Sequence, residues 1–309
     1  MRNQPALTLK VRVLRLQFQA LRALAPGLAQ RWAERIFSTP RRHEAPEVER
    51  AILPSSHAFG FQSQGLRLQA RCWGEGPAVA LLHGWEGRGT QFHAFIQPLL
   101  AAGFSALTFD QPAHGRSQGR QAGPLAFASA LQALVAEVGP IHGVVAHSLG
   151  AASAAIALDR GLKVPRLVFI APPSEPDPYF SGLLSLLGVP DVEHPAAMDL
   201  LAARQGVTME QIRLRSLAPH LGAPLLVIHD RKDRETPYSG AETVVAAWPG
   251  ARLLSTEGLG HRRILKDPKV VQETVAFLRE EEISNTTPYL GCGSRSLEWN
   301  LFHRHLRFA

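Results

Sequence analysis

The chain has few cysteines and no long uncharged apolar run. Two cysteines, Cys72 and Cys292, occur among its 309 residues, and they form no C-x-x-C pair. This low count argues against a disulfide framework and a cysteine-based zinc cluster, so we expect a reducing, cytoplasmic compartment. No stretch reaches the roughly 18 apolar residues of a transmembrane helix. Lys10, Arg12 and Arg15 interrupt the start of the chain, which argues against a signal peptide.

Motifs for nucleotides and metals are also missing. The sequence has no G-x-x-x-x-G-K-S/T and no well-placed G-x-G-x-x-G, so no nucleotide cofactor is expected. His303 and His305 are potential metal ligands, but no cluster of carboxylates or cysteines accompanies them. We therefore predict an activity that needs neither a cofactor nor a metal ion.

Acidic residues are scarce in the first quarter of the chain. Residues 1–71 contain twelve Arg and Lys against four Glu, whereas the rest is near neutral and the whole chain carries +7. No nucleic-acid-binding motif accompanies this charge, so nucleic acid is not expected as a partner. The other proportions are ordinary for a globular protein, with 45% hydrophobic and 19% charged residues. The length fits one α/β domain with a cap and extensions.

A serine lies at the centre of a strand–turn–helix pattern. The apolar run 141–145 leads into the pentapeptide Ala-His-Ser-Leu-Gly, and the small residues 151–155 follow it. Such a turn holds its serine in a strained backbone conformation, so bulky flanking side chains would collide. Ala146 stands where glycine is more usual, which is a mild departure. The pattern predicts a nucleophile elbow at Ser148.

A serine nucleophile needs a histidine to take its proton and a carboxylate to fix the tautomer of that histidine. Both residue types follow Ser148 at the ends of predicted strands. One short apolar strand runs into Asp230 and Asp233, and the next runs into His261. From the residues alone, either aspartate could be the acid. The order Ser, Asp, His, each after a strand, is typical of one large hydrolase arrangement.

At these motifs the chain resembles the α/β-hydrolase superfamily, on its serine esterase/lipase-like branch. The resemblance spans roughly residues 55–282 and rests on segments 81–85, 109–117, 146–150, 233–237 and 258–261. It implies that Asp233 is the acid, because this residue precedes Thr236-Pro237 as in the family pattern D-x-x-V-P. Asp230 remains the alternative.

An oxyanion hole should accompany the elbow, because the tetrahedral intermediate needs two preorganised N–H donors. The backbone N–H of Leu149 is expected to be one donor, since it begins the helix after the elbow. The resemblance implies that the second donor is the backbone N–H of Trp85, in the segment His-Gly-Trp. The indole of Trp85 should also narrow the acyl pocket.

Alternating apolar runs and helical patterns predict a doubly wound, mostly parallel α/β sheet over residues 51–282. An antiparallel hairpin (57–62 and 66–73) should precede six parallel strands at 78–82, 105–109, 141–146, 166–170, 225–228 and 251–255. Helices are expected at 90–102, 125–138, 148–158, 240–248 and 268–282. Chemistry in such sheets lies at the carboxyl ends of the strands, where the three predicted catalytic residues fall.

The stretch 172–223 is too long for a simple connection between two strands. It contains helical patterns near 179–187, 197–205 and 209–217, and the resemblance implies that it forms a cap over the active site. Five of its apolar side chains could line the substrate pocket or equally be ordinary core residues: Phe180, Leu183, Leu184, Leu187 and Met198.

Residues 1–50 should form an amphipathic helical extension. Apolar residues recur at spacings of three and four from Leu14 to Ile36, and Pro26 should kink or split the helix. Packing against the same domain or a second subunit is favoured, and peripheral contact of the basic face with an anionic membrane is the alternative. Residues 283–309 do not match the family, and we expect a disordered or vector-derived tail.

The sequence thus predicts hydrolysis of small carboxylic esters of short-to-medium acyl chain through an acyl-enzyme on Ser148. Two alternatives stay open: a cofactor-free haloperoxidase or perhydrolase, and a binding protein that kept the fold without catalysis. The presence of Ser148, Asp233 and His261 argues against the second. A dehalogenase or epoxide hydrolase of this fold would carry aspartate at the elbow. The oligomeric state is left open.

Overall fold

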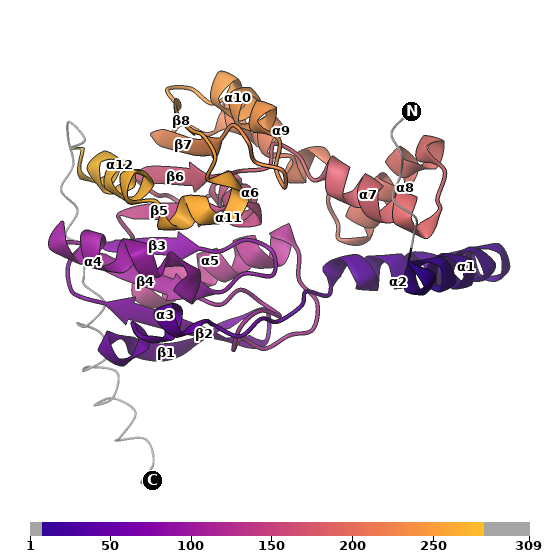
Figure 1. Ribbon diagram of the computed structural model, residues 1–309, viewed down its shortest axis with the longest axis horizontal. Helices are drawn as coiled ribbons and strands as arrows, with labels where there is room; N and C mark the ends of the chain where they lie inside the picture. The colour runs from indigo at the N-terminus through magenta and orange to yellow at the C-terminus, as the bar shows by residue number, and fades with distance from the viewer. Residues whose placement is uncertain (1–7, 281–309) are drawn as a thin grey trace, which may run out of the picture.

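The computed structural model describes residues 8–280, and an eight-stranded sheet runs through their centre (Figure 1). The strands are β1 (His57–Ser63), β2 (Leu66–Trp73), β3 (Ala78–Leu82), β4 (Ser105–Phe109), β5 (Gly143–His147), β6 (Arg166–Ile170), β7 (Leu225–Asp230) and β8 (Arg252–Thr256). Their order in the sheet is β1-β2-β4-β3-β5-β6-β7-β8. β2 pairs antiparallel with β1 and β4, and all other neighbours are parallel. The predicted hairpin and six parallel strands are confirmed.

Helices cover both faces of the sheet, which explains why every residue of β3 to β7 is buried. One face packs against α4 (His93–Ala101) and α12 (Pro268–Arg279). The other face packs against α5 (Pro124–Val138), α6 (Leu149–Asp159) and α10 (Tyr238–Ala247). This arrangement confirms the doubly wound fold, and it brings the carboxyl ends of the parallel strands to one edge of the sheet.

A helical layer lies beyond that edge (Figure 1). The cap segment supplies α7 (Asp177–Leu187) and α8 (His194–Arg204) to this layer, together with short 3-10 turns. Its last helix, α9 (Leu214–Leu217), packs against α6 and α10 instead. The helix expected near 209–217 is not continuous. Arg213 adopts an extended conformation (φ −83°, ψ 117°) between a 3-10 turn and α9. Its guanidinium pairs with Asp177 and Glu210, and these ion pairs tie the break to α7.

The N-terminal segment forms two helices that pack on the cap. Pro26 is the first residue of α2 (Pro26–Ser38) and separates it from α1 (Leu9–Leu24), as the sequence indicates. One side of this pair is buried, with Phe18 and Trp32 in ring contact at 6.1 Å. Polar links add to the packing, since the Gln19 side-chain amide donates to the carbonyl oxygen of Leu187 at 2.7 Å. A short helix, α3 (Glu47–Arg50), leads into β1.

No helix within residues 8–280 is both long and apolar enough to cross a bilayer. The cytoplasmic location therefore stays a prediction from the sequence. The predicted tail, with His303 and His305, lies outside the described residues.

Candidate active site

Ser148 lies at the sharp turn between β5 and α6 with φ 53° and ψ −125°, a backbone conformation that residues other than glycine rarely adopt. Two glycines make room for this turn. A Cβ atom on Gly150 would lie 2.7 Å from the carbonyl oxygen of Leu82, and one on Gly84 would lie 2.8 Å from Cβ of Ser148. Ala146 is fully buried in β5, where its methyl group joins the hydrophobic core. The structure therefore has the geometry of a nucleophile elbow.

His261 and Asp233 meet at the ends of neighbouring strands. His261 is the second residue of the short helix α11 (Gly260–Arg263) after β8, and its Nδ1 lies 2.8 Å from Oδ2 of Asp233. The other carboxylate oxygen, Oδ1, accepts hydrogen bonds from the backbone N–H groups of Glu235 (2.8 Å) and Thr236 (3.0 Å). Burial would raise the pKa of Asp233, but hydrogen bonds from His229, His261 and the Thr236 backbone hold it well below its ordinary value. The carboxylate therefore stays charged beside the imidazole.

Asp230 has a different environment although it is only three residues from Asp233. Its carboxylate accepts hydrogen bonds from the backbone N–H groups of Lys232 (2.9 Å), Gly258 (3.2 Å) and Leu259 (2.8 Å). The hydroxyl of Thr256 donates to it as well, at 2.9 Å. These bonds anchor the loop that leads from β8 to His261. Of the two aspartates, only Asp233 faces the imidazole.

Thr236 occupies the position where the family pattern has valine, and its hydroxyl joins the site. Oγ1 donates to Oδ2 of Asp233 at 2.9 Å and lies 3.1 Å from Nδ1 of His261. The sequence alone shows threonine in place of the valine of D-x-x-V-P but does not indicate its role. That departure was the one available signal, because a buried hydroxyl needs a partner whereas a valine methyl does not.

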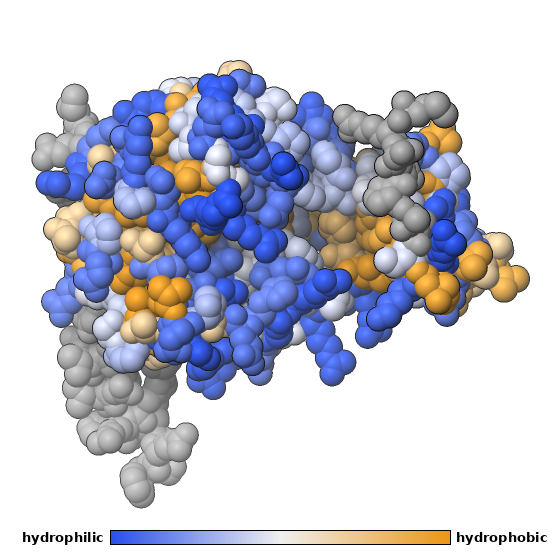
Figure 2. Space-filling model, in the orientation of Figure 1, coloured by the Kyte–Doolittle hydropathy of each residue, from blue (hydrophilic) through white to orange (hydrophobic). Residues whose placement is uncertain are grey.

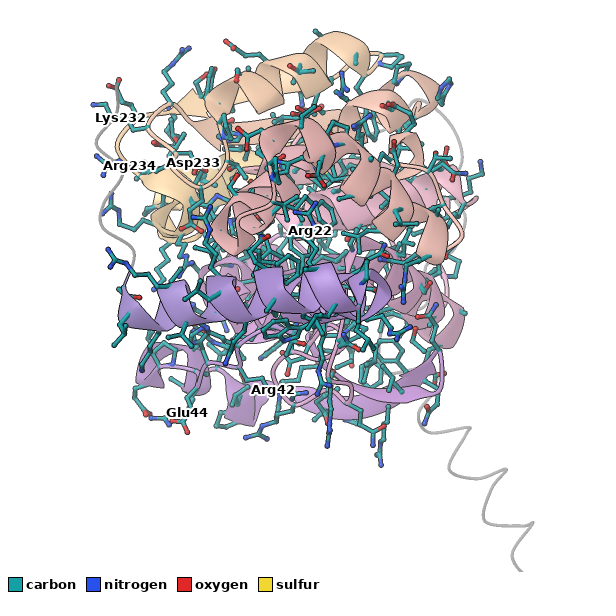
Figure 3. All side chains as sticks on the ribbon, turned by 90° about the vertical axis from the view of Figure 1, so that its right-hand side faces the viewer. Arg22, Arg42, Glu44, Lys232, Asp233 and Arg234 are labelled. Carbon is teal, nitrogen blue, oxygen red and sulfur yellow. The ribbon has the colours of Figure 1, made fainter. Side chains whose placement is uncertain are left out.

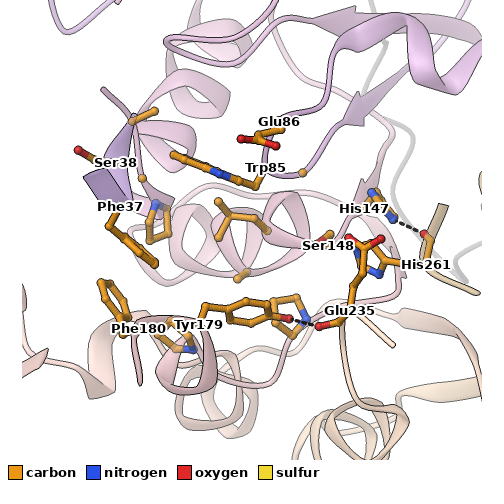
Figure 4. Close-up of a pocket in the computed structure, with 18 of the residues that line it drawn as sticks. Phe37, Ser38, Trp85, Glu86, His147, Ser148, Tyr179, Phe180, Glu235 and His261 are labelled. Atoms are coloured by element: carbon orange, nitrogen blue, oxygen red, sulfur yellow. Dashed lines mark hydrogen bonds between the residues drawn. The ribbon is translucent and has the colours of Figure 1, made fainter. Parts of the chain in front are cut away.

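Three further buried histidines, in addition to His229, support the site. Nε2 of His147 lies 2.8 Å from the carbonyl oxygen of His261, and the two rings are 4.6 Å apart (Figure 4). Burial, followed by the nearby His261, lowers the pKa of His147 to about 3. The neutral ring therefore donates its Nε2–H to that carbonyl and fixes the backbone of His261.

His83 and His114 hold the loop that follows β3. Nε2 of His83 accepts from the backbone N–H of Gln111 at 3.0 Å, and its Nδ1 lies 2.7 Å from the Gly84 carbonyl oxygen. Nε2 of His114 accepts from the backbone N–H of Glu86 at 3.0 Å. Burial is the largest cause that lowers the pKa of both, to about 4 for His114. Both rings are therefore neutral near pH 7, and this state matches the bonds they accept.

The two expected oxyanion donors flank the nucleophile. Trp85 and Leu149 line the same cavity as Ser148, and Leu149 is the first residue of α6. Within residues 8–280, the backbone N–H groups of Trp85 and Leu149 have no acceptor. Free N–H groups at a helix start attract negative charge. The arrangement suits an oxyanion next to Ser148.

A cavity of about 740 Å³ opens in front of Ser148 and His261, between the sheet edge and the helical layer. Of the predicted pocket residues, Phe180 and Leu183 line this cavity. The other three belong to the hydrophobic core instead and are not among its lining residues: Leu184, Leu187 and Met198. They lie on α7 and α8, on sides that pack within the helical layer.

The N-terminal segment also contributes to this cavity, which the sequence analysis did not anticipate. Ile36, Phe37 and Ser38 at the end of α2 are among the lining residues. The ring of Phe37 stacks on that of Phe180 at a centroid distance of 4.0 Å (Figure 4). A weak signal existed, because Phe37 is a large apolar residue that directly follows Ile36, the last of the periodic apolar residues.

Within residues 8–280, no group of three or more metal-ligating side chains occurs.

Comparison with known proteins agrees with this architecture. Residues 79–274 match the family described as "Alpha/beta hydrolase family". A curated relative is the pimeloyl-[acyl-carrier protein] methyl ester esterase of Xanthomonas axonopodis pv. citri (strain 306). It is 28% identical over 242 residues, which are 65% of this chain and 94% of the relative.

Several solved structures are also similar. An esterase of Pyrococcus furiosus has a TM-score of 0.61 at 19% identity and covers 78% of this chain and 98% of its own. An esterase of Exiguobacterium antarcticum has a TM-score of 0.58 at 17% identity, over 72% of this chain and 100% of its own. A bromoperoxidase of Bacillus anthracis reaches 0.57 at 17% identity with the same coverage. At these identities the likeness shows a shared fold.

Proposed function

The chain belongs to the alpha/beta hydrolase family, and we propose that it hydrolyses carboxylic esters of short-to-medium acyl chain through an acyl-enzyme on Ser148. One observation carries the proposal: a serine in the strained elbow shares a cavity with an imidazole that is bonded to a buried carboxylate at 2.8 Å. A serine, a histidine and an aspartate in these positions are what nucleophilic acyl transfer needs. The name of the curated relative, a methyl ester esterase, supports the same reaction class.

The proposed first half-reaction begins when Oγ of Ser148 attacks the ester carbonyl carbon. Nε2 of His261 takes the hydroxyl proton, while Asp233 holds Nδ1–H and stabilises the imidazolium that forms. The carbonyl oxygen becomes an oxyanion, which the N–H groups of Leu149 and Trp85 bind. When the intermediate collapses, the carbon–oxygen bond to the alcohol breaks, and His261 gives its proton to the departing alkoxide oxygen.

The second half-reaction uses water in place of the alcohol. His261 removes a proton from water as the water oxygen attacks the acyl-enzyme, and a second oxyanion forms in the same place. Collapse releases the carboxylic acid and returns the proton to Oγ of Ser148. Asp233 keeps its charge throughout, because the hydrogen bonds to its carboxylate hold its pKa well below the ordinary value.

The cavity indicates where the acyl chain would lie. Its volume of about 740 Å³ is within the usual range for small-molecule sites. The side toward the helical layer includes the apolar residues Phe37, Phe180 and Leu183 among its lining. We place the acyl chain against these side chains, with the stacked pair Phe37–Phe180 limiting its length.

Hydrolysis of p-nitrophenyl esters from acetate to palmitate tests this function. We expect turnover with a maximum at short-to-medium chains, and labelling of the protein by a fluorophosphonate. Ser148→Ala should abolish both, because loss of a triad serine costs several orders of magnitude in kcat.

Ser153→Ala is a matched control for Ser148→Ala. Ser153 is buried in α6, the helix that follows Ser148, and its hydroxyl donates to the carbonyl oxygen of Leu149 at 2.8 Å. This variant should keep its turnover. The proposed ester hydrolysis would be refuted if the wild-type protein hydrolysed no ester of the series and were not labelled by a fluorophosphonate. The haloperoxidase alternative would be favoured if the protein hydrolysed no ester but catalysed the oxidation of a halide by hydrogen peroxide in the presence of a carboxylic acid.

A further inference from the structure

Helix α1 has two apolar faces, and within residues 8–280 only one of them is covered. Leu14, Phe18 and Leu21 pack toward the rest of the protein. The opposite side carries a second apolar stripe at spacings of three, four and eight residues, which places its members on one helix face. They are Leu9, Val13, Leu16 and Leu24, with exposed fractions of 77%, 44%, 70% and 86%.

Helix α2 likewise exposes an apolar side chain followed by basic ones. Leu28 is 48% exposed, and Arg31 and Arg35 follow it at spacings of three and seven. We define the outer face by these residues together with their exposed neighbours: Leu9, Lys10, Arg12, Val13, Leu16, Leu24, Leu28, Arg31 and Arg35. Five of the nine exposed large hydrophobic side chains within residues 8–280 belong to it. Figure 2 shows orange side chains at the end of the molecule formed by α1.

The positive charge of the outer face indicates which kind of partner it would bind. It carries four cations and no carboxylate. Two further arginines of α1 are turned away from it: Arg22 pairs with Glu193 of the cap (Figure 3), and Arg15 lies against Gly188. The acidic residue of α2, Glu34, pairs with Arg204 at 3.2 Å. A second copy of the chain would bring the same positive charge and be repelled, whereas an anionic surface would be attracted.

We propose that the outer face docks this protein on an anionic lipid bilayer. The helix pair would lie in the plane of the interface, with Leu9, Leu16 and Leu24 at the boundary between headgroups and acyl chains. Lys10, Arg12, Arg31 and Arg35 would contact lipid phosphates at the surface. An apolar stripe flanked by lysine and arginine is the pattern of helices that lie on membranes.

The position of the outer face relates docking to the cavity. α2 presents Leu28 and Arg31 outward and contributes Ile36 and Phe37 to the cavity that contains Ser148. Helix α2 therefore borders both the proposed lipid surface and the cavity that contains the nucleophile. For an ester carried in the bilayer, this short route would favour entry from the membrane. The route depends on the proposed esterase function, whereas the docking itself does not.

Flotation of the full chain with vesicles tests the docking. We expect binding to vesicles of phosphatidylcholine mixed with phosphatidylglycerol and weak binding to phosphatidylcholine alone, with loss of binding at high salt. Arg31→Gln with Arg35→Gln should weaken the partition coefficient by about tenfold or more. Leu16→Ser with Leu24→Ser should weaken it by at least about tenfold, although the net charge is unchanged.

Val48→Ser is the matched control, because Val48 is 53% exposed on α3, outside the outer face. It should bind vesicles like the wild type. All of these variants should hydrolyse a soluble p-nitrophenyl butyrate normally and keep their melting temperature, since the altered side chains are exposed. A failure of ester hydrolysis would thus count against the proposed function and leave the docking result unaffected.

Three results would overturn the proposal. The first is a wild-type chain that floats with neither kind of vesicle. The second is double variants that bind as well as the wild type. The third is a dimer in light scattering that disappears in Leu16→Ser with Leu24→Ser, which would make a second copy the occupant of the outer face.

Discussion

The edge of the sheet and the helical wall of the cavity are built in different ways. At the sheet edge, Ser148 and Asp233 follow the buried strands β5 and β7, and His261 follows the partly exposed edge strand β8. Short hydrogen bonds fix Asp233 and His261. The opposite wall is made by helices α2 and α7, which meet through the stacked rings of Phe37 and Phe180. Polar networks hold a geometry, whereas apolar contacts fill space and tolerate changes of shape. We therefore expect changes at the edge to affect the rate of the chemistry and changes in the wall to affect substrate choice.

The largest effect should come from the acid at the sheet edge. Asp233→Asn should lower kcat by about ten-thousandfold, because the amide cannot hold the imidazole in the tautomer that accepts a proton from serine. The profile over acyl-chain length should keep its shape, since no wall residue has changed. Steady-state kinetics over the p-nitrophenyl series measures both.

Asp230→Asn is the matched control for Asp233→Asn. Its amide would lose part of a network of four hydrogen bonds in the loop before His261, so the melting temperature should fall. The remaining folded enzyme should lose far less activity than Asp233→Asn does. If Asp230→Asn reduced kcat more at a temperature where both variants are folded, Asp230 would be the acid.

The second effect concerns the pH dependence of stability, which should arise mainly from buried histidines at the sheet edge. His83, His114 and His147 at the sheet edge are buried and have lowered pKa values, to about 4 for His114. A histidine whose folded pKa is below its unfolded value stabilises the protein fully above about pH 6.5 and loses this contribution as the pH falls. Each such group changes the free energy of unfolding by about 1.4 kcal/mol per pH unit, hence about 3 kcal/mol for His114 between pH 6.5 and 4.

Urea unfolding at a series of pH values measures this loss. We expect a marked fall in the free energy of unfolding between pH 6.5 and 4 and a shallower fall in His114→Gln, whose side chain does not titrate. Asp233 should add its own loss only below about pH 4, because its pKa is lowered from the ordinary carboxyl range. A free energy of unfolding that stays constant from pH 7 to 4.5 would contradict the buried, neutral state of these histidines.

The two regions also differed in how far the sequence could predict them. The strands were predicted to within two residues, because near-continuous apolar runs such as β5 are typical of strands buried on both faces. The triad candidates follow these strands directly, so local motifs located them. The distinction between Asp230 and Asp233 needed the loop conformation, since both are aspartates after the same strand.

The wall could not be predicted in the same way. Phe37 and Phe180 are far apart in the sequence, and only the packing of α2 on α7 brings their rings together. Periodicity predicted that α1 and α2 would bury an apolar face, but it contains no information on which surface receives it. Leu184, Leu187 and Met198 have the same apolar character as Leu183 and yet lie in the core. Their difference is one of direction on α7 and α8, which depends on tertiary packing.

A substitution in the helical wall should have the smallest effect on the rate and the clearest effect on the preferred acyl-chain length. Phe37→Ala would remove a ring from the stack on Phe180 and enlarge the cavity next to the proposed acyl position. We expect the preferred acyl chain to lengthen by several carbons, because each additional buried methylene contributes about 0.8 kcal/mol of binding. For p-nitrophenyl acetate, kcat/KM should change by less than about tenfold, since the polar network at the sheet edge is untouched.

Phe59→Ala separates this effect from a general loss of packing. Phe59 is a partly buried aromatic on β1 that contacts His57 and is not among the cavity-lining residues. Its removal should reduce the melting temperature without moving the optimum of the chain-length profile. If Phe37→Ala left that optimum unchanged, or if Phe59→Ala moved it equally, then α2 would not limit the acyl chain. The helical wall would then contribute only to packing, and the idea that the sheet edge sets the rate while the wall sets substrate choice would be wrong.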